Sequence, residues 1–340
     1  MTDDAVSSAA LSDATTGIGE DSFDEFSFLP AQAESIGYAG ALPSAERLRI
    51  TLPDGRTLTG LRYGDGPPVL TFLHGAGLNA HTWDTTLLAL GLPALALDLP
   101  GHGDSSWRSD ADYSPATLRD DVATAIDAWT DDPQVLVGHS LGGLTAAAVA
   151  AARPDLVRRL VIVDITPGVN PDAGPRQVRQ FFAGPTDWAS RDELVERALS
   201  FGLGGTREAA TRGVYLNSRV RADGRVEWKH HFAHLAAAAA ASIGRDDGAS
   251  ASAAPAAPAP DSDVVRDALS PTGWDDLAAV RAPVLLIRGD AGYVTEADAA
   301  EFAHKRPGAS VVSVPAHHNV HEEIPVELAA LLRDEVDRRE

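Results

Sequence analysis

One serine lies at the centre of the most chemically suggestive segment of this chain, Gly138-His139-Ser140-Leu141-Gly142. An apolar run at residues 134–137 precedes the segment and an alanine-rich run at 144–152 follows it, so a strand should turn directly into a helix at Ser140. The two glycines remove side chains that would collide in such a turn. The helix N-terminus then directs free amide groups at the place where the oxyanion of an acyl-transfer reaction forms. The pattern predicts a serine nucleophile.

The surrounding sequence supplies the elements that such a turn requires. Apolar runs typical of strands buried on both faces alternate with helix-forming stretches. The runs cover residues 69–73, 94–98, 135–137, 160–164, 284–288 and 311–314, and the helical stretches cover 116–129, 144–152, 296–303 and 326–333. Residues 47–52 and 57–62 alternate polar and apolar around a Pro-Asp-Gly turn, which indicates a hairpin. Together these patterns predict an α/β fold with a mostly parallel central sheet and helices on both faces.

One interval of about 120 residues interrupts the alternation and is too long for a single crossover helix. Helix-like stretches at 176–182, 191–201 and 207–215 predict a helical cap, inserted after the sixth strand, over the carboxyl edge of the sheet. We expect the cap to span 166–269, with a flexible Ala/Pro/Ser-rich segment at about 236–263, and the core to comprise 41–165 and 270–340. Residues 1–40 are acidic and lack a sustained period, which predicts a mobile leader.

The composition excludes several classes of function. A formal charge of −21 and a pI near 4.8 disfavour nucleic-acid binding, because a phosphate backbone repels an acidic surface. The absence of cysteine excludes disulfides and thiolate sites. No basic and apolar leader or membrane-spanning run is evident, so we expect a cytoplasmic protein without membrane partners; the sequence leaves the oligomeric state open. His230, His231 and His234 lack a carboxylate at ligand spacing, and we expect no metal there.

Four motifs in order resemble the α/β-hydrolase superfamily, and in particular its serine esterase-like members with a helical cap. They are His74-Gly75-Ala76-Gly77, Asp98-Leu99-Pro100-Gly101-His102-Gly103-Asp104-Ser105, the segment around Ser140, and Ala316-His317-His318-Asn319-Val320-His321. Each follows one of the predicted strands, and the resemblance extends over residues 46–340 except for the cap, where only the placement matches. The resemblance implies an α/β-hydrolase fold.

The resemblance also implies a role for each motif in acyl transfer. Ser140 is the expected nucleophile, and the superfamily's general-base histidine aligns with His318 in the loop after the last strand. His317 replaces the glycine usual before that histidine, so a shift by one residue makes His317 the alternative. The expected oxyanion hole consists of the backbone amides of Leu141 and Ala76. No cofactor is implied.

The acid of the expected triad departs from the commonest pattern of the superfamily. Many members carry Gly-x-x-Asp after the penultimate strand, but here that position holds Gly292. Asp164 ends an earlier strand, from which some members supply their acid, and Asp290 lies two residues short of the usual place. Both keep the chain order serine, acid, histidine. We favour Asp164, because it reaches the carboxyl edge of the sheet without a loop rearrangement.

These residues favour one reaction within the superfamily. A serine at the turn disfavours its dehalogenases and epoxide hydrolases, which use aspartate there. We expect a carboxylesterase that cleaves a small or medium ester through an acyl-enzyme on Ser140, since a cap normally encloses a pocket. One alternative with the same fold and triad is a hydrolase of carbon–carbon bonds in vinylogous diketones. An alternative of another class is a non-catalytic ligand-binding protein on a hydrolase scaffold.

Overall fold

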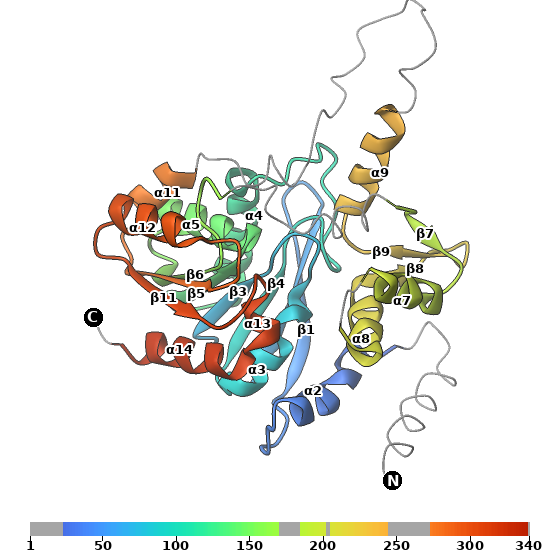
Figure 1. Ribbon diagram of the computed structural model, residues 1–340, viewed down its shortest axis with the longest axis horizontal. Helices are drawn as coiled ribbons and strands as arrows, with labels where there is room; N and C mark the ends of the chain where they lie inside the picture. The colour runs from blue at the N-terminus through green and yellow to red at the C-terminus, as the bar shows by residue number, and fades with distance from the viewer. Residues whose placement is uncertain (1–22, 170–183, 202–204, 244–272, 339–340) are drawn as a thin grey trace, which may run out of the picture.

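The computed structural model describes residues 23–169, 184–201, 205–243 and 273–338, and its centre is an eight-stranded sheet (Figure 1). The strand order is β1-β2-β4-β3-β5-β6-β10-β11. β1 pairs antiparallel with β2 and β2 antiparallel with β4, and every later pair is parallel. The strands are β1 (Ala45–Thr51), β2 (Thr57–Tyr63), β3 (Leu70–Leu73), β4 (Ala94–Asp98), β5 (Gln134–His139), β6 (Val157–Val163), β10 (Val284–Gly289) and β11 (Ser310–Val314). The predicted α/β fold with a mostly parallel sheet is confirmed.

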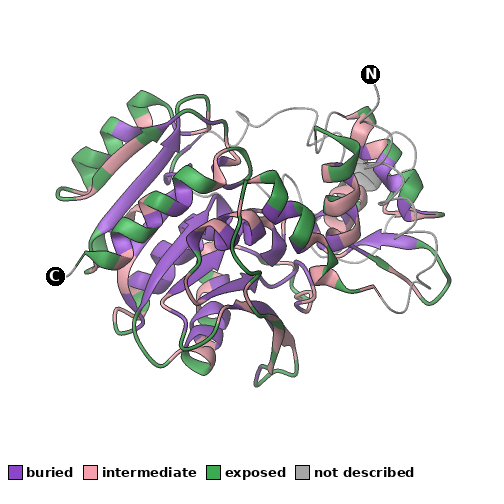
Figure 2. Ribbon diagram, turned by 90° about the horizontal axis from the view of Figure 1, so that it is seen from below, coloured by how far each residue is buried: buried purple, intermediate pink, exposed green. Residues whose placement is uncertain are grey.

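Helices cover both faces of the sheet, and the sequence of β5 shows why its strands read as continuous apolar runs. Leu136 packs in one hydrophobic cluster, whereas Val135 and Val137 pack in the other. Because successive side chains of a strand point to opposite faces, a strand covered on both sides needs apolar residues throughout. Figure 2 shows these strands buried beneath helices whose outward faces are exposed.

The two helical layers differ in how well the sequence predicts them. One layer comprises α4 (Pro115–Trp129), α5 (Leu141–Ala152), α11 (Gly273–Ala279) and α12 (Glu296–Lys305), and the other α3 (Asp84–Leu90), α13 (Val320–Glu323) and α14 (Pro325–Asp337). α4, α5, α12 and α14 occupy the predicted stretches to within a few residues. The pattern does not predict α3, α11 or α13, because helices of seven residues or fewer display too little of the 3.6-residue period.

The segment between β6 and α11 contains a three-stranded antiparallel sheet as well as helices. Its elements are β7 (Asp187–Trp188), α7 (Arg191–Ser200), α8 (Arg207–Asn217), β8 (Ser218–Val220), β9 (Val226–Trp228) and α9 (Phe232–Ile243), with sheet order β7-β9-β8. The helices predicted at 191–201 and 207–215 correspond to α7 and α8, whereas the sequence does not predict the small sheet, because strands of two or three residues leave no readable alternation. The helix predicted at 176–182 and the tract at 244–263 lie outside the described residues.

Two hydrogen bonds tie this segment to the loop that follows β3, at the carboxyl edge of the large sheet. The side-chain amide of Asn79 donates to the Leu216 carbonyl (3.2 Å), and that of Asn217 donates to the Gly77 carbonyl (2.7 Å). A further contact, a hydrogen bond from the His231 amide to the Gly101 carbonyl (2.8 Å), reaches the loop after β4. The segment thus contacts the loops at the edge where parallel sheets place their sites.

The end of the expected leader is ordered helical structure. Residues Glu25–Phe28 form a 3-10 helix, η2, which continues into α2 (Leu29–Ser35). Leu29 and Ala33 are buried in the core, 4% and 6% exposed. The prediction of a mobile leader over residues 1–40 is therefore corrected for residues 25–35, while residues 1–22 lie outside the described chain. Leu29 and Ala33 dock the helix on the core, and Glu25 adds an ion pair with Arg47.

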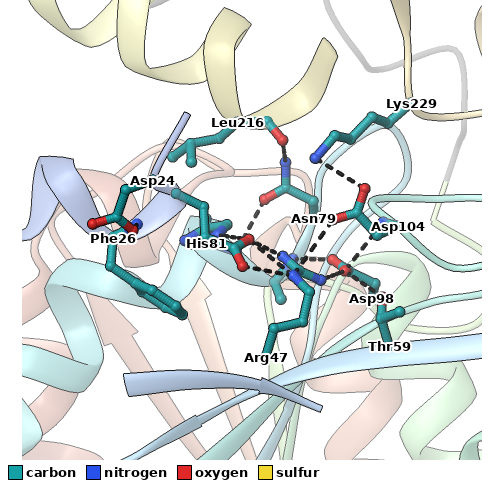
Figure 3. Close-up of polar contacts among 12 residues, drawn as sticks. Asp24, Phe26, Arg47, Thr59, Asn79, His81, Asp98, Asp104, Leu216 and Lys229 are labelled. Carbon is teal, nitrogen blue, oxygen red and sulfur yellow. Dashed lines mark hydrogen bonds and ion pairs between the residues drawn. The ribbon is translucent and has the colours of Figure 1, made fainter. Parts of the chain in front are cut away.

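Glu25 joins a buried ionic network centred on Arg47 and Asp98 (Figure 3). Arg47 Nη1 lies 2.7 Å from Asp98 Oδ2, and its Nε donates to Glu25 Oε1 at 2.8 Å. Asp98 also accepts hydrogen bonds from the Thr59 hydroxyl (2.7 Å) and the Ala80 amide (2.8 Å). Burial raises the pKa of Asp98, but Arg47 and these donors together hold it well below its usual range. The network fixes the N-terminal segment and the β4 loop to each other.

We predict that Arg47→Met destabilises the protein by about 3–5 kcal/mol, because it leaves the buried carboxylate of Asp98 without its cation. Arg119→Met is the matched control, since Arg119 pairs only with the exposed Asp120 among the described residues and should change stability by less than about 0.5 kcal/mol. Urea unfolding measures both. Equal stability of the two variants would show that the network contributes nothing beyond a surface ion pair.

Candidate active site

Ser140 lies in a strained turn between β5 and α5. Its backbone has φ 51° and ψ −122°, a conformation that non-glycine residues rarely adopt, and the residue is 7% exposed. A Cβ atom on Gly138 would lie 2.2 Å from the Gly142 carbonyl oxygen, and one on Gly142 would lie 2.3 Å from the Leu73 carbonyl oxygen. The close approach of the neighbouring backbone therefore requires glycine at both positions, as the sequence predicts.

The loop after β3 packs against this turn. A Cβ atom on Gly75 would lie 3.2 Å from Ser140 Cβ. His74 holds the loop in place, because its Nδ1 donates to the Gly75 carbonyl (2.8 Å) while its Nε2 accepts from the Leu99 amide (3.0 Å). Accepting at one nitrogen makes the buried His74 ring neutral, and burial lowers its pKa. Within the described chain the amides of Ala76 and Leu141 have no hydrogen-bond acceptor, which suits donors of an oxyanion hole.

The structure brings His318 and Asp164 together. His318 Nδ1 lies 2.8 Å from Asp164 Oδ2, and the Asp164 side chain is fully buried. The same carboxylate accepts hydrogen bonds from the Gly289 amide (3.0 Å) and the Tyr293 amide (2.7 Å). Three donors therefore fix the carboxylate, and the carboxylate fixes the imidazole with Nδ1 protonated. This tautomer leaves Nε2 as a proton acceptor.

Gly292 leaves room for the side chain of Asp164 at the end of β6. A Cβ atom on Gly292 would lie 2.3 Å from Asp164 Oδ1, so a side chain at position 292 and the carboxylate of Asp164 compete for one volume. Asp290, the alternative acid, is exposed, and no hydrogen bond joins it to His318 in the described structure. The geometry therefore associates Asp164, rather than Asp290, with the histidine.

His317, the alternative base, points away from this carboxylate. Its side chain is 76% exposed, and its Nδ1 lies 3.0 Å from Glu323 Oε2. The hydrogen bond to Glu323 raises the pKa of His317. Of the two neighbouring histidines, His318 is the one that contacts Asp164.

Two buried histidines support the loop that carries His318, and the sequence gives no signal for this role. His139 Nε2 donates to the His318 carbonyl (3.0 Å), and the His139 ring lies 4.5 Å from that of His318 and 4.6 Å from that of His321. His321 Nε2 lies 2.8 Å from the Thr82 hydroxyl. Burial lowers the pKa of His139 well below its usual value and that of His321 to about 3, so both rings are neutral near pH 7.

The described residues offer no arrangement of three His, Cys, Asp or Glu side chains that could hold a metal ion. Burial lowers the pKa of His230 to about 3 and that of His231 to about 4. The His231 ring stacks on Trp107 with centroids 4.5 Å apart, so this histidine packs as an aromatic side chain. None of the described helices is both long and apolar enough to span a membrane.

Comparisons with known proteins connect this geometry to a family. The family model of the alpha/beta hydrolase family matches residues 72–331. Esterase Rv0045c of Mycobacterium tuberculosis is 34% identical over 327 residues, which cover 93% of this chain and 97% of the esterase. The 2-(acetamidomethylene)succinate hydrolase of Mesorhizobium japonicum is 29% identical over 276 residues, which cover 80% of this chain and 88% of the hydrolase.

Solved structures agree with the sequence comparisons. A structure of the Mycobacterium tuberculosis esterase matches with a TM-score of 0.73 and 32% identity, covering 93% of this chain and 99% of that one. A crystal structure of E-2-(acetamidomethylene)succinate hydrolase matches with a TM-score of 0.69, covering 87% of this chain and 100% of that one. The latter is 23% identical, so its likeness concerns the fold alone.

We predict that Asp164→Asn slows modification of Ser140 by a fluorophosphonate by about 10³- to 10⁴-fold, because the amide no longer orients and stabilises the protonated imidazole. Asp290→Asn is the control and should react at the rate of the unaltered protein. Stopped-flow or gel-based labelling measures the rate. A large loss in Asp290→Asn with none in Asp164→Asn would reverse the assignment of the acid.

We predict that acid destabilises the protein partly through His321. Above pH ~6.5 neither the folded nor the unfolded chain protonates this ring, and its contribution to stability is complete. As the pH falls from ~6.5 toward ~3, the unfolded chain binds a proton that the folded chain excludes, which costs about 1.4 kcal/mol per pH unit. His321→Gln should flatten this fall, whereas His304→Gln on the exposed face of α12 should not. The unfolding free energy is measured at pH 7.5 and at pH 5 for the unaltered protein and both variants. An equal fall between the two pH values in all three proteins would exclude this role of His321.

Proposed function

Because the chain belongs to the α/β-hydrolase family, we propose that it is a serine esterase whose triad is Ser140, His318 and Asp164. The substrate is a carboxylic ester of small or medium size. The proposal is carried by the fully buried Asp164 carboxylate 2.8 Å from the His318 ring, together with the strained strand-to-helix turn at Ser140. The similarity to an esterase along nearly the whole chain supports it. Cytoplasmic location and the lack of nucleic-acid or membrane partners stay predictions.

The first half of the reaction transfers the acyl group to the serine. His318 Nε2 takes the proton of Ser140 Oγ as Oγ attacks the ester carbonyl carbon. The amides of Leu141 and Ala76 donate to the oxyanion, and Asp164 stabilises the imidazolium. The C–O bond to the alcohol then breaks, His318 returns the proton to the departing oxygen, and an acyl-enzyme on Ser140 remains.

The second half of the reaction releases the acid. A water molecule replaces the alcohol, gives its proton to His318 Nε2 and attacks the acyl carbon. The same amides stabilise the second oxyanion, and collapse of this intermediate returns the proton from His318 to Ser140 Oγ. The ester is thereby converted to a carboxylic acid and an alcohol with no cofactor.

The segment between β6 and α11 contacts the loop that carries Ala76. Gly77, one residue beyond Ala76, accepts the hydrogen bond from Asn217 at the end of α8. The position of the cap and the position of one expected oxyanion donor are therefore linked. A substrate that displaces α8 would therefore also disturb this loop.

We predict that p-nitrophenyl esters with short and medium acyl chains are hydrolysed and that Ser140→Ala lowers kcat by about 10⁴-fold or more, because no acyl-enzyme can form. Release of p-nitrophenolate across a series of acyl lengths measures both. The control is Ser106→Ala, which alters a serine in the β4 loop whose hydroxyl accepts a hydrogen bond from the Thr57 amide.

Two results would contradict the esterase proposal. Turnover of a ring-cleavage vinylogous diketone with no turnover of any ester would favour the carbon–carbon bond hydrolase. Failure of a fluorophosphonate to modify Ser140, in a protein that still binds esters, would favour the non-catalytic ligand-binding protein.

A further inference from the structure

We propose that Tyr293 is a positioning residue for His318, whose ring holds the imidazole from one face and stabilises the imidazolium that forms during acyl transfer. The inference rests on the proposed function, because it assumes that His318 is the base. Tyr293 follows β10 and is remote in sequence from both His318 and Ser140. None of the four sequence motifs includes Tyr293.

The two rings overlap almost completely. Their centroids lie 3.6 Å apart and their planes differ by 9°. Two neutral aromatic rings avoid this arrangement, because their quadrupoles repel each other and favour an offset or an edge-to-face pair. Full overlap becomes favourable when one ring is cationic and faces the electron-rich surface of the other. The geometry therefore suits the protonated form of His318 better than the neutral form.

Tyr293 also contacts the acid, through its backbone. Its amide donates to Asp164 Oδ2 at 2.7 Å, and the same oxygen lies 2.8 Å from His318 Nδ1. The tyrosine ring controls the plane of the imidazole, while the tyrosine amide controls the oxygen that orients it. One residue thus touches both partners of the proposed nucleophile.

The loop that carries Tyr293 is held firmly. The Ala291 amide donates to the Ala316 carbonyl (3.1 Å) and the Gly292 amide to the Gly289 carbonyl (3.1 Å). Val294, directly after the tyrosine, is fully buried, and its carbonyl accepts from Arg288 Nε at 2.9 Å. Because little of this loop can move, the tyrosine ring is a fixed surface for the imidazole.

Other titratable groups near His318 do not replace this effect. From the described elements, Asp164 faces it at the end of β6, His139 at the end of β5 and His321 on α13. The two histidines are neutral near pH 7 because burial lowers the pKa of each. Asp164 is unchanged by substitutions at 293, so a comparison of variants at that position isolates the ring.

We predict that Tyr293→Leu lowers the pKa of His318 by about one unit, whereas Tyr293→Phe, which keeps the aromatic face, lowers it by less than about 0.3 unit. The probe is the full chain with 13C-labelled histidine, titrated by NMR without substrate and assigned by comparison with His318→Gln. A Tyr293→Leu protein that folds and has an unshifted His318 pKa would overturn the proposal.

The pH dependence of ester hydrolysis should shift in the same direction as the pKa of His318. Loss of the stacked face makes His318 a weaker base that is deprotonated at lower pH, so the acidic limb of kcat/KM moves to lower pH in Tyr293→Leu. We expect kcat to fall about 3- to 30-fold with little change in KM, since the face stabilises charge that develops only in the transition state. An equal fall in Tyr293→Phe would assign the effect to the hydroxyl and overturn the role of the ring.

Two controls keep these outcomes distinct. If Tyr293→Leu does not fold, pentafluorophenylalanine at position 293 replaces it in the test. This side chain keeps the shape of the ring but reverses the charge of its face. An unshifted His318 pKa in that variant would also overturn the proposal. Ester turnover that persists in Ser140→Ala would contradict the proposed function, yet the NMR comparison would still report whether the ring stabilises the imidazolium.

Discussion

The carboxylate of Asp164 is the contact on which the proposed site depends. It joins the ends of β6 and β10 with the loop that carries His318, because it accepts hydrogen bonds from Gly289, Tyr293 and the imidazole. Its own backbone has φ 48°, and it occupies volume that a side chain at position 292 would fill. The carboxylate of Asp164 in this position therefore requires a glycine at 292.

A second buried carboxylate, Asp98, connects the core to the parts that surround the site. Arg47 links it to Glu25 in the N-terminal helix, and the Ala80 amide links it to the loop after β3. Lys229, beyond β9, pairs with Asp104 in the β4 loop at 3.1 Å. Figure 3 shows the Arg47–Asp98 and Lys229–Asp104 contacts close together. Electrostatic contacts thus hold the N-terminal segment, the β3 and β4 loops and the cap in register.

The fold could be predicted from the sequence, whereas much of the environment of the site could not. The apolar runs predict the buried strands, and the glycines around Ser140 predict the tight turn, because each pattern lies within a few consecutive residues. In the helical segment 25–35, Glu25 pairs with Arg47, and in the loop after β10, Tyr293 stacks on His318. Each is a contact between residues distant in the chain. Such contacts leave no periodic signal, and the short strands of the cap leave none either.

Trapping of the acyl-enzyme would identify the nucleophile. The protein is mixed with a p-nitrophenyl ester, quenched in acid within one turnover, digested and analysed by mass spectrometry. We expect the mass of the acyl group on Ser140. Rapid ester hydrolysis with no acyl group on Ser140, or with the acyl group on another residue, would contradict Ser140 as the nucleophile.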